Sequence, residues 1–260
     1  MNKRKGRITI PTDESYVEGT KKIADLWGAD AVRDCDGVKL PKNPKEIADK
    51  VYNVYFVDRG NHEWAASNPD EWQHMFVMTP FITATETTLA VHLMDTFFDQ
   101  QVKPDFTPDA IKHMEVMDRT TGQVWNEWEV DVENGNVIIK NAVPFHQYTV
   151  AFLMISLWHP VHMYNYITNN WDEPHHIMYD PYYPKTKKFI RENLQRWCDE
   201  NPESNVVRFT TFLYMFTLVY NQFGKERNVD WFGYNMAVSP RMLDDFEKEY
   251  GYKMRAEYLV

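Results

Sequence analysis

The chain of 260 residues has little cysteine and little glycine, and both shortages narrow its function. Its two cysteines, Cys35 and Cys198, provide neither a disulfide framework nor a CxxC pair for zinc or redox chemistry. Among its 10 glycines there is no GxGxxG and no GxxxxGK[ST], the loops that cradle dinucleotide and nucleoside phosphates. Nucleotide-binding folds that depend on those loops are therefore disfavoured.

Long apolar runs and excess positive charge are also missing. The two longest apolar stretches, residues 149–158 and 209–220, are shorter than the ~20 residues that a membrane-spanning helix needs. The basic N-terminus has no apolar segment behind it, so it does not resemble a secretory signal. The formal net charge of −10 repels nucleic-acid phosphates and anionic lipids. We therefore expect a cytoplasmic protein with neither nucleic acid nor membrane as a partner.

What the sequence does contain is an alternation of predicted strands and helices. Residues 31–33, 205–212 and 228–234 are predicted strands, and residues 149–158 form an apolar run typical of a buried parallel strand. Helices are predicted over residues 12–27 and 186–198, from Asn43 through an apolar stripe of Ile47, Val51 and Val54, and from Ser239 to Gly251.

Residues 70–145 have a different character. They contain several short strand-like segments, and residues 133–136, ENGN, are typical of a hairpin turn between two of them. We interpret this region as a β-rich insertion within the surrounding α/β domain.

The alternation favours a (β/α)₈ barrel of the TIM type over a doubly wound sheet, because the phosphate-binding loops of the latter are absent. A barrel needs eight strand–helix units, and only about four are predicted here. We therefore expect residues 1–260 to be the N-terminal portion of a barrel catalytic domain in a longer protein.

In such a barrel, functional residues lie at the carboxyl ends of the strands. Arg33 ends the first predicted strand, Arg208 lies within an apolar one, and Asn165 follows the strand that ends at Trp158. A guanidinium group binds a carboxylate or a phosphate equally well, so a structural ion pair remains open for each arginine. For Asn165 the alternative is an amide on a helix surface.

Residues 158–171, WHPVHMYNYITNNW, combine flat rings with amides, a composition suited to the apolar faces and hydroxyl groups of a sugar. Trp158, Tyr164 and Trp171 are candidates for stacking on such a ligand. The histidines of this segment match no familiar ligand spacing, so we expect no metal site. No GxSxG motif indicates covalent acyl chemistry.

Four segments together resemble the N-terminal part of the 1,3-β-galactosyl-N-acetylhexosamine phosphorylases, the galacto-N-biose/lacto-N-biose phosphorylases. They are LWGADAVRDCDG (26–37), WHPVHMYNYITNNW (158–171), VVRFTTFLYMFTL (206–218) and VDWFGYNMAVSPRMLDDFEKEYGY (229–252). The resemblance covers nearly the whole chain. It implies a (β/α)₈ barrel catalytic domain that is followed by further domains.

The resemblance also implies an activity, the inverting phosphorolysis of β-galactosyl disaccharides to α-galactose 1-phosphate and an N-acetylhexosamine. Arg33 and Arg208 would bind phosphate or substrate, and Asn165 would bind sugar hydroxyls. Phosphate serves as co-substrate, so no cofactor is expected beyond the disaccharide and phosphate. The complete protein is expected to be a homodimer.

The acceptor sugar remains open, because galactosyl-β-1,4-L-rhamnose phosphorylases share these motifs. Pro160 and Val161 resemble the hexosamine-acting members, which makes Val161 a candidate sugar contact, whereas Tyr234 stands where a smaller residue is expected. A retaining β-galactosidase-like hydrolase and a non-catalytic sugar-binding module are the alternatives from other classes. The hydrolase would require two carboxyl groups ~5–5.5 Å apart.

The resemblance places the general acid, an Asp, beyond residue 260. Within the chain, Asp230 matches a different motif, and Glu127 and Glu129 belong to the predicted insertion. We therefore expect the isolated chain to be inactive, and poorly soluble because an incomplete barrel exposes apolar strand faces.

Overall fold

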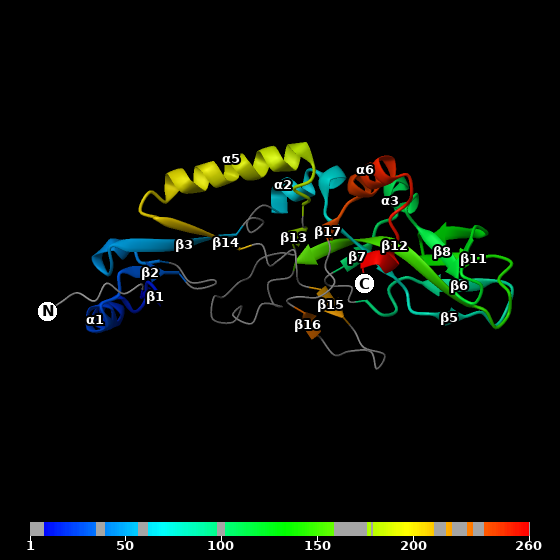
Figure 1. Ribbon diagram of the computed structural model, residues 1–260, viewed down its shortest axis with the longest axis horizontal. Coiled ribbons are helices and arrows are strands. Elements are labelled where there is room, and N and C mark those ends of the chain that lie inside the picture. Colours follow the sequence, from blue (N-terminus) through cyan, green and yellow to red (C-terminus); the bar gives the residue numbers. More distant parts are fainter. Residues whose placement is uncertain are drawn as a thin grey trace. The chain divides into compact units, whose positions relative to one another are not determined.

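The computed structural model describes residues 8–34, 40–56, 62–97, 102–158, 176–177, 179–210, 217–219, 228–230 and 237–259 (Figure 1). The chain divides into two compact units. The first comprises residues 1–59, 159–174 and 184–211, and the second comprises residues 60–158, 175–183 and 212–260. The first unit contains a parallel sheet, and the second contains antiparallel sheets.

The parallel sheet has four strands in the order β1-β2-β3-β14. These are β1 (Thr9–Pro11), β2 (Ala31–Arg33), β3 (Lys50–Phe56) and β14 (Val206–Thr210), and each neighbouring pair is parallel. The strands predicted at residues 31–33 and 205–212 are thus confirmed. The second of them is the last strand of the described sheet, and its Val206 and Phe209 side chains are exposed.

Two helices of the first unit pack on the same face of this sheet. Helix α1 (Val17–Trp27) contributes Ala24 to a core that contains Val32 and Val51. Helix α5 (Pro184–Glu200) places Trp197 edge-on against Tyr55, with ring centroids 5.4 Å apart. Val51 and Tyr55 alternate onto one side of β3, so both helices cover that side.

The predicted helix over residues 12–27 begins later than expected. The Thr12 amide donates to the Arg33 carbonyl at 2.9 Å, which keeps this residue in extended pairing beside β2. Helix α1 begins at Val17 and ends at Gly28, whose φ of 65° is the left-handed conformation of a terminating glycine. The predicted stop is therefore confirmed, whereas the predicted start is wrong.

The helix predicted from Asn43 is also wrong. Only a single 3₁₀ turn, Pro44–Glu46, forms there, and strand β3 follows directly. Val51 and Val54, assigned to a helical stripe, lie in this strand between β2 and β14. The alternating branched and aromatic residues of Lys50–Phe56 favour a strand, and sheet pairing outweighs the short helical spacing.

The second unit is organised around strand β12 (Gln147–Trp158), which pairs antiparallel with its neighbours. Those partners are β4 (His74–Met78), β5 (Ile82–Thr83), β7 (Val102–Pro104), β8 (Glu115–Asp118) and β13 (His176–Ile177). Strands β9 (Gln123–Trp125) and β17 (Ala237–Val238) extend the sheet.

Residues 149–158 therefore form a strand, as predicted, but the prediction that this strand is parallel is wrong. Phe152 packs in one apolar core of the unit, and its neighbour Leu153 packs in another. A continuous apolar run indicates that a strand is buried on both faces. Such burial occurs in parallel and antiparallel strands alike, so the run does not determine the direction.

A second antiparallel sheet joins β6 (Leu89–His92), β10 (Trp128–Asp131) and β11 (Asn136–Ile139). Strands β10 and β11 form the hairpin predicted at ENGN, with Asp131 opposite Asn136 and with Gly135 at a φ of 67°. The described strands within residues 70–145 thus pair antiparallel, unlike the sheet of the first unit.

The remaining elements of the second unit are short. Its described residues also form helices α2 (His62–Ala66), α3 (Pro108–Ile111) and α6 (Pro240–Tyr250), strands β15 (Thr217–Val219) and β16 (Asn228–Asp230), and 3₁₀ turns at Pro69–Glu71 and Ala256–Leu259. Helix α6 is confirmed as predicted, because the Ser239 hydroxyl accepts from the Met242 amide and Gly251 ends the helix. Within the described ranges, every helix is too short or too polar to cross a bilayer.

Candidate active site

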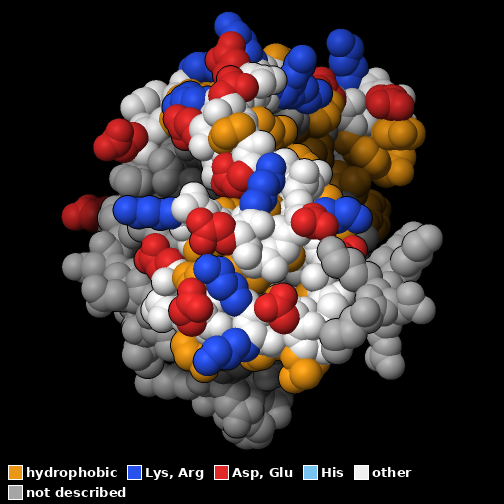
Figure 2. All heavy atoms as spheres, turned by 90° about the vertical axis from the view of Figure 1, so that its left-hand side faces the viewer, with side chains coloured by type: hydrophobic (Ala, Val, Ile, Leu, Met, Phe, Trp, Pro, Cys, Tyr) orange, Lys and Arg blue, Asp and Glu red, His pale blue; other side chains and the backbone are white. Residues whose placement is uncertain are grey.

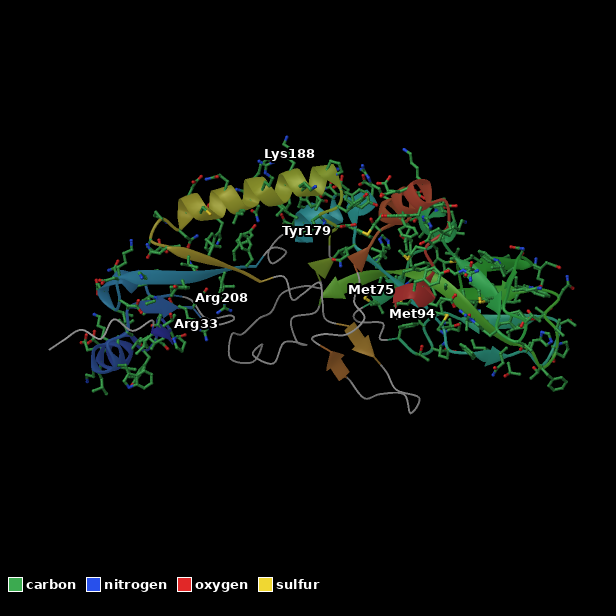
Figure 3. All side chains as sticks on the ribbon, in the orientation of Figure 1. Arg33, Met75, Met94, Tyr179, Lys188 and Arg208 are labelled. Carbon is green, nitrogen blue, oxygen red and sulfur yellow. The ribbon has the colours of Figure 1, made fainter. Side chains whose placement is uncertain are left out.

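The parallel sheet carries both predicted arginines. Arg33 is the last residue of β2, at its carboxyl end, and Arg208 is the third residue of β14. Both side chains are half-buried. The Arg33 guanidinium donates to the carbonyl oxygen of Asp34 at 3.4 Å. Figure 3 labels the two arginines next to each other on the strands of the first unit.

The strand register places these two side chains on one face. Arg33 is in register with Tyr52 of β3, and Tyr52 is in register with Val206 of β14. Arg208 lies two residues beyond Val206, so it points to the same side of the sheet. This side is opposite to the face of Val51 and Tyr55, on which the two helices pack.

The two arginines are also close enough to share a ligand. One strand separates them laterally, and two residues separate them along the strands. From strand spacings of about 4.8 Å and a rise of about 3.3 Å per residue, their Cα atoms are roughly 12 Å apart. Two long cationic side chains at this spacing can approach a small anion from two directions.

Asp34, the residue after Arg33, was not identified as a candidate from the sequence. Its side chain is buried, and its Oδ2 accepts from the Val54 amide at 2.9 Å. Its own amide donates to the Tyr52 carbonyl at 3.3 Å. These bonds continue the pairing of β2 and β3 past Arg33. The signal that identifies it is an acidic residue directly after an apolar strand.

The other predicted sugar contacts lie beyond what the structure describes. Trp158 ends β12, opposite His176 of β13, but its side chain is outside the described residues. Val161, Tyr164, Asn165 and Trp171 are also outside them. Their roles therefore remain predictions from the sequence.

Glu127 and Glu129, set aside as general acids, are both exposed and paired. The Glu127 carboxylate accepts from the Asn141 amide, and Glu129 lies 2.5 Å from the Lys140 ammonium. Among the described residues, no group of three His, Cys, Asp or Glu side chains is arranged to hold a metal ion.

Several lysines on the surface of the first unit lie next to carboxylates. Lys21 pairs with Glu18 and Glu46 at 3.3 Å, and Lys50 lies 3.7 Å from Asp30. On the face shown in Figure 2, Lys and Arg side chains are likewise interspersed with Asp and Glu. Among the side chains drawn in colour on this face, Lys and Arg form no continuous basic stripe.

Comparison with known proteins gives a family match over almost the entire chain. Residues 6–260 match the model described as the lacto-N-biose phosphorylase N-terminal TIM barrel domain. The chain is 51% identical, over 98% of its length, to a 1,3-β-galactosyl-N-acetylhexosamine phosphorylase of Lachnoclostridium phytofermentans, and it covers 36% of that relative.

Two further relatives bear on the acceptor. A 1,3-β-galactosyl-N-acetylhexosamine phosphorylase of Bifidobacterium longum subsp. longum is 43% identical over 98% of the chain, which covers 34% of that relative. A D-galactosyl-β-1→4-L-rhamnose phosphorylase of Lachnoclostridium phytofermentans is 33% identical over 98% of the chain, which covers 36% of it. The chain thus spans about a third of the length of these relatives.

Proposed function

Since the chain belongs to the family of lacto-N-biose phosphorylase N-terminal TIM barrel domains, we propose that the whole protein catalyses phosphorolysis of β-galactosyl disaccharides. A phosphate oxygen attacks the anomeric carbon of the galactosyl unit from the face opposite the leaving group. The new C1–O bond forms as the glycosidic C1–O bond breaks, and inversion gives α-galactose 1-phosphate. The reaction makes the protein a hexosyltransferase.

The observation that supports this proposal is the shared face of Arg33 and Arg208. Phosphate is already an anionic nucleophile, so it needs to be held in line rather than activated by a second carboxylate. Two guanidinium forks are suited to that task, because each binds two oxygens of one anion. We assign Arg33 and Arg208 to phosphate or to the adjacent side of the galactosyl unit. No metal or organic cofactor is needed for this step.

The leaving oxygen needs a proton. Expelling an N-acetylhexosamine as an alkoxide is prohibitive at neutral pH, so a carboxylic acid must protonate the glycosidic oxygen as the bond breaks. We place this acid, an Asp, outside the 260 residues. Asn165 would bind sugar hydroxyls, and Trp158, Val161, Tyr164 and Trp171 would contact the disaccharide. The 260 residues alone should accordingly be inactive.

For the acceptor we propose an N-acetylhexosamine. The two relatives at 51% and 43% identity carry that name, whereas the rhamnose-acting relative is 33% identical. The latter keeps galactosyl-β-1,4-L-rhamnose as the second candidate substrate. We also propose that the whole protein is a cytoplasmic homodimer, which cell fractionation and light scattering would test.

A substrate panel tests the proposal. The purified whole protein is incubated with lacto-N-biose, galacto-N-biose and galactosyl-β-1,4-L-rhamnose, each with and without phosphate. We expect phosphate-dependent cleavage of the first two, with the α-anomer of galactose 1-phosphate seen by ³¹P and ¹H NMR. Cleavage of the rhamnoside alone would overturn the acceptor assignment. Galactose release that does not depend on phosphate would overturn phosphorolysis itself.

A further inference from the structure

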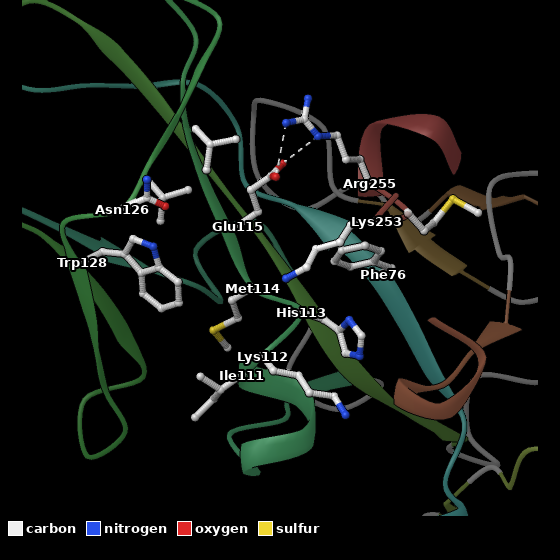
Figure 4. A pocket seen from close by; sticks show the side chains of 13 residues that line it. Phe76, Ile111, Lys112, His113, Met114, Glu115, Asn126, Trp128, Lys253 and Arg255 are labelled. Carbon is white, nitrogen blue, oxygen red and sulfur yellow. Dashed lines mark hydrogen bonds and ion pairs between the residues drawn. The ribbon is translucent and has the colours of Figure 1, made fainter. Parts of the chain in front are cut away.

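The antiparallel unit contains a pocket of about 500 Å³ that the proposed reaction does not use (Figure 4). Its walls come from strands β4, β8, β9 and β10, from the end of α3 with the residues that follow it, and from residues 253–255. A pocket of this size matches a monosaccharide-sized or slightly larger ligand.

One side of the pocket is apolar and offers a flat ring. Met114 is buried in one core of the unit, so this wall is anchored, whereas Phe76, buried in another core, lies beside Lys253 (Figure 4). Trp128 is half-buried in β10 and is held opposite Ile139 of β11. The neighbouring Asn126 is exposed and supplies amide donors and an acceptor at the rim. An indole ring beside an amide suits the C–H face and hydroxyl groups of a sugar.

The other side of the pocket is cationic. Arg255 is neutralised, because its guanidinium lies 3.2 Å from Glu115 and 3.4 Å from Glu257. Lys112 is neutralised as well, at 2.7 Å from Asp244. Within the part of the chain that the structure describes, Lys253 has no carboxylate partner. Lys253 is exposed to solvent and lines the pocket, so its ammonium group is available to a ligand.

The Lys253 side chain is directed into the pocket. Figure 4 shows its ammonium group extending toward Met114 and the side of the pocket that carries Trp128. Nearby His113 adds no charge at neutral pH, because burial holds the pKa of its imidazole below the ordinary value even though Asp244 acts to raise it. The ammonium group is thus placed to bind an anion whose remainder lies along the ring.

We propose that this pocket binds a monosaccharide that carries one anionic group, with the sugar ring against Trp128 and the anion on Lys253. A phosphate or a carboxylate would supply the same chemistry. The proposal concerns the antiparallel unit and does not depend on the proposed phosphorolysis.

Two methionines that line the pocket, Met114 and Met254, provide a local readout. The purified whole protein is labelled with [methyl-¹³C]methionine, and the two resonances are assigned with Met114→Leu and Met254→Leu. Titration with glucose 6-phosphate, glucuronate and uncharged glucose distinguishes a phosphate from a carboxylate and either from a neutral sugar. Saturable shifts of both methyl groups by at least one anionic sugar are the expected result.

Substitutions of Lys253 test whether its positive charge contributes to binding. Lys253→Gln should weaken binding of the anionic sugar at least tenfold, as loss of a charge-assisted hydrogen bond typically does (about tenfold or more). Lys253→Arg should stay within about threefold of the unchanged protein. The matched control is Lys248→Gln, because Lys248 is an exposed lysine of α6 that does not line the pocket.

Several outcomes would overturn the proposal. Absence of shifts at Met114 and Met254 at ~10 mM of every anionic sugar would show that the pocket is not such a site. If glucose binds as tightly as the anionic sugars, or if Lys253→Gln leaves the affinity unchanged, the anionic group does not contribute to binding. If benzoate binds as tightly as the anionic sugars, the pocket does not recognise the sugar ring. Activity on disaccharides should be the same in Lys253→Gln, so a failure here is distinguishable from a failure of the proposed function.

Discussion

Arg33 and Arg208 lie on the same face of the parallel sheet, with β3 between them: Arg33 is in register with Tyr52, and Arg208 is in register with Val54. Helices α1 and α5 pack on the opposite face. In a (β/α)₈ barrel the helices cover the outside, so the two arginines face the interior. Their position is the structural basis for assigning them to phosphate.

The first prediction concerns Arg208. Arg208→Lys in the whole protein keeps the charge but replaces the planar fork with a single ammonium group, so we expect the KM for phosphate to rise roughly tenfold or more. Initial rates at varied phosphate and saturating disaccharide measure this. Arg196→Lys is the matched control, because Arg196 is exposed on α5. A KM for phosphate that is unchanged in Arg208→Lys would leave Arg208 as a structural residue.

The second prediction concerns Asp34. Asp34→Ala removes the acceptor of the Val54 amide, and a buried unsatisfied amide costs about 1–3 kcal/mol in the free energy of unfolding. The change should also raise the KM for phosphate, because Asp34 fixes the end of the strand that carries Arg33. Asp34→Asn keeps a side-chain oxygen acceptor and should lose less on both counts. Urea unfolding and phosphate kinetics together check this, and equal losses in the two variants would contradict it.

The third prediction concerns the packing of α5 on the sheet. Tyr55 is buried, its ring contacts Trp197 and Phe209, and its hydroxyl accepts from the Asn193 amide at 3.0 Å. Tyr55→Ala should lower the free energy of unfolding by about 3–5 kcal/mol, because it leaves a cavity. Tyr55→Phe should cost about 1 kcal/mol, because it removes only the hydroxyl.

Hydrogen exchange locates the effect of Tyr55→Ala. Faster exchange is expected for the amides of β3 and β14, which pair next to the cavity. Amides of β12 in the other unit should exchange at their original rates. Equal acceleration in both units would contradict a local role for Tyr55.

The fourth prediction concerns Asp118, a buried carboxylate in the antiparallel unit. Burial acts to raise its pKa, but hydrogen bonds from His146 and from the backbone of Thr120 and Thr121 hold the pKa below its ordinary value. A lowered pKa means that the folded state binds this proton less readily than the unfolded state. The carboxylate therefore stabilises the fold fully above the unfolded pKa of about 3.9 and loses that contribution as the pH falls below it.

Asp118→Asn tests this pH dependence. At pH 7 the variant should be less stable by about 1–3 kcal/mol, because it loses a charged acceptor at a buried site. The difference from the unchanged protein should shrink as the pH is lowered from about 5 to 3. Urea midpoints across this range measure it, and a difference that grows toward low pH would contradict the assignment.

The sequence was most informative where local chemistry decides the structure. Helix α6 was predicted because a capping serine and a terminating glycine lie at its ends, and both act locally. The direction of β12 was not predictable from its residues, because the same apolar run serves a parallel or an antiparallel strand that is buried on both faces. Strand β3 was mistaken for a helix because Ile47, Val51 and Val54 also fit a helical spacing.

In the candidate site, too, the sequence identified individual residues but not the contacts between distant segments. Arg33 and Arg208 stood out because charge is rare in apolar strands, but only the register of β2, β3 and β14 shows that they share a face. Asp34 was missed because its partner, the Val54 amide, lies on another strand. The pocket of Trp128 and Lys253 was not predictable, because it joins side chains that are distant in the sequence.

The central claim is that phosphate, and not water, attacks the galactosyl carbon. The most direct test is to run the reaction of the whole protein on lacto-N-biose with unlabelled phosphate in H₂¹⁸O and to analyse the products by mass spectrometry. The account predicts α-galactose 1-phosphate without ¹⁸O, because its C1 oxygen comes from phosphate. Free galactose, and not galactose 1-phosphate, as the first product would show attack by water and would contradict it.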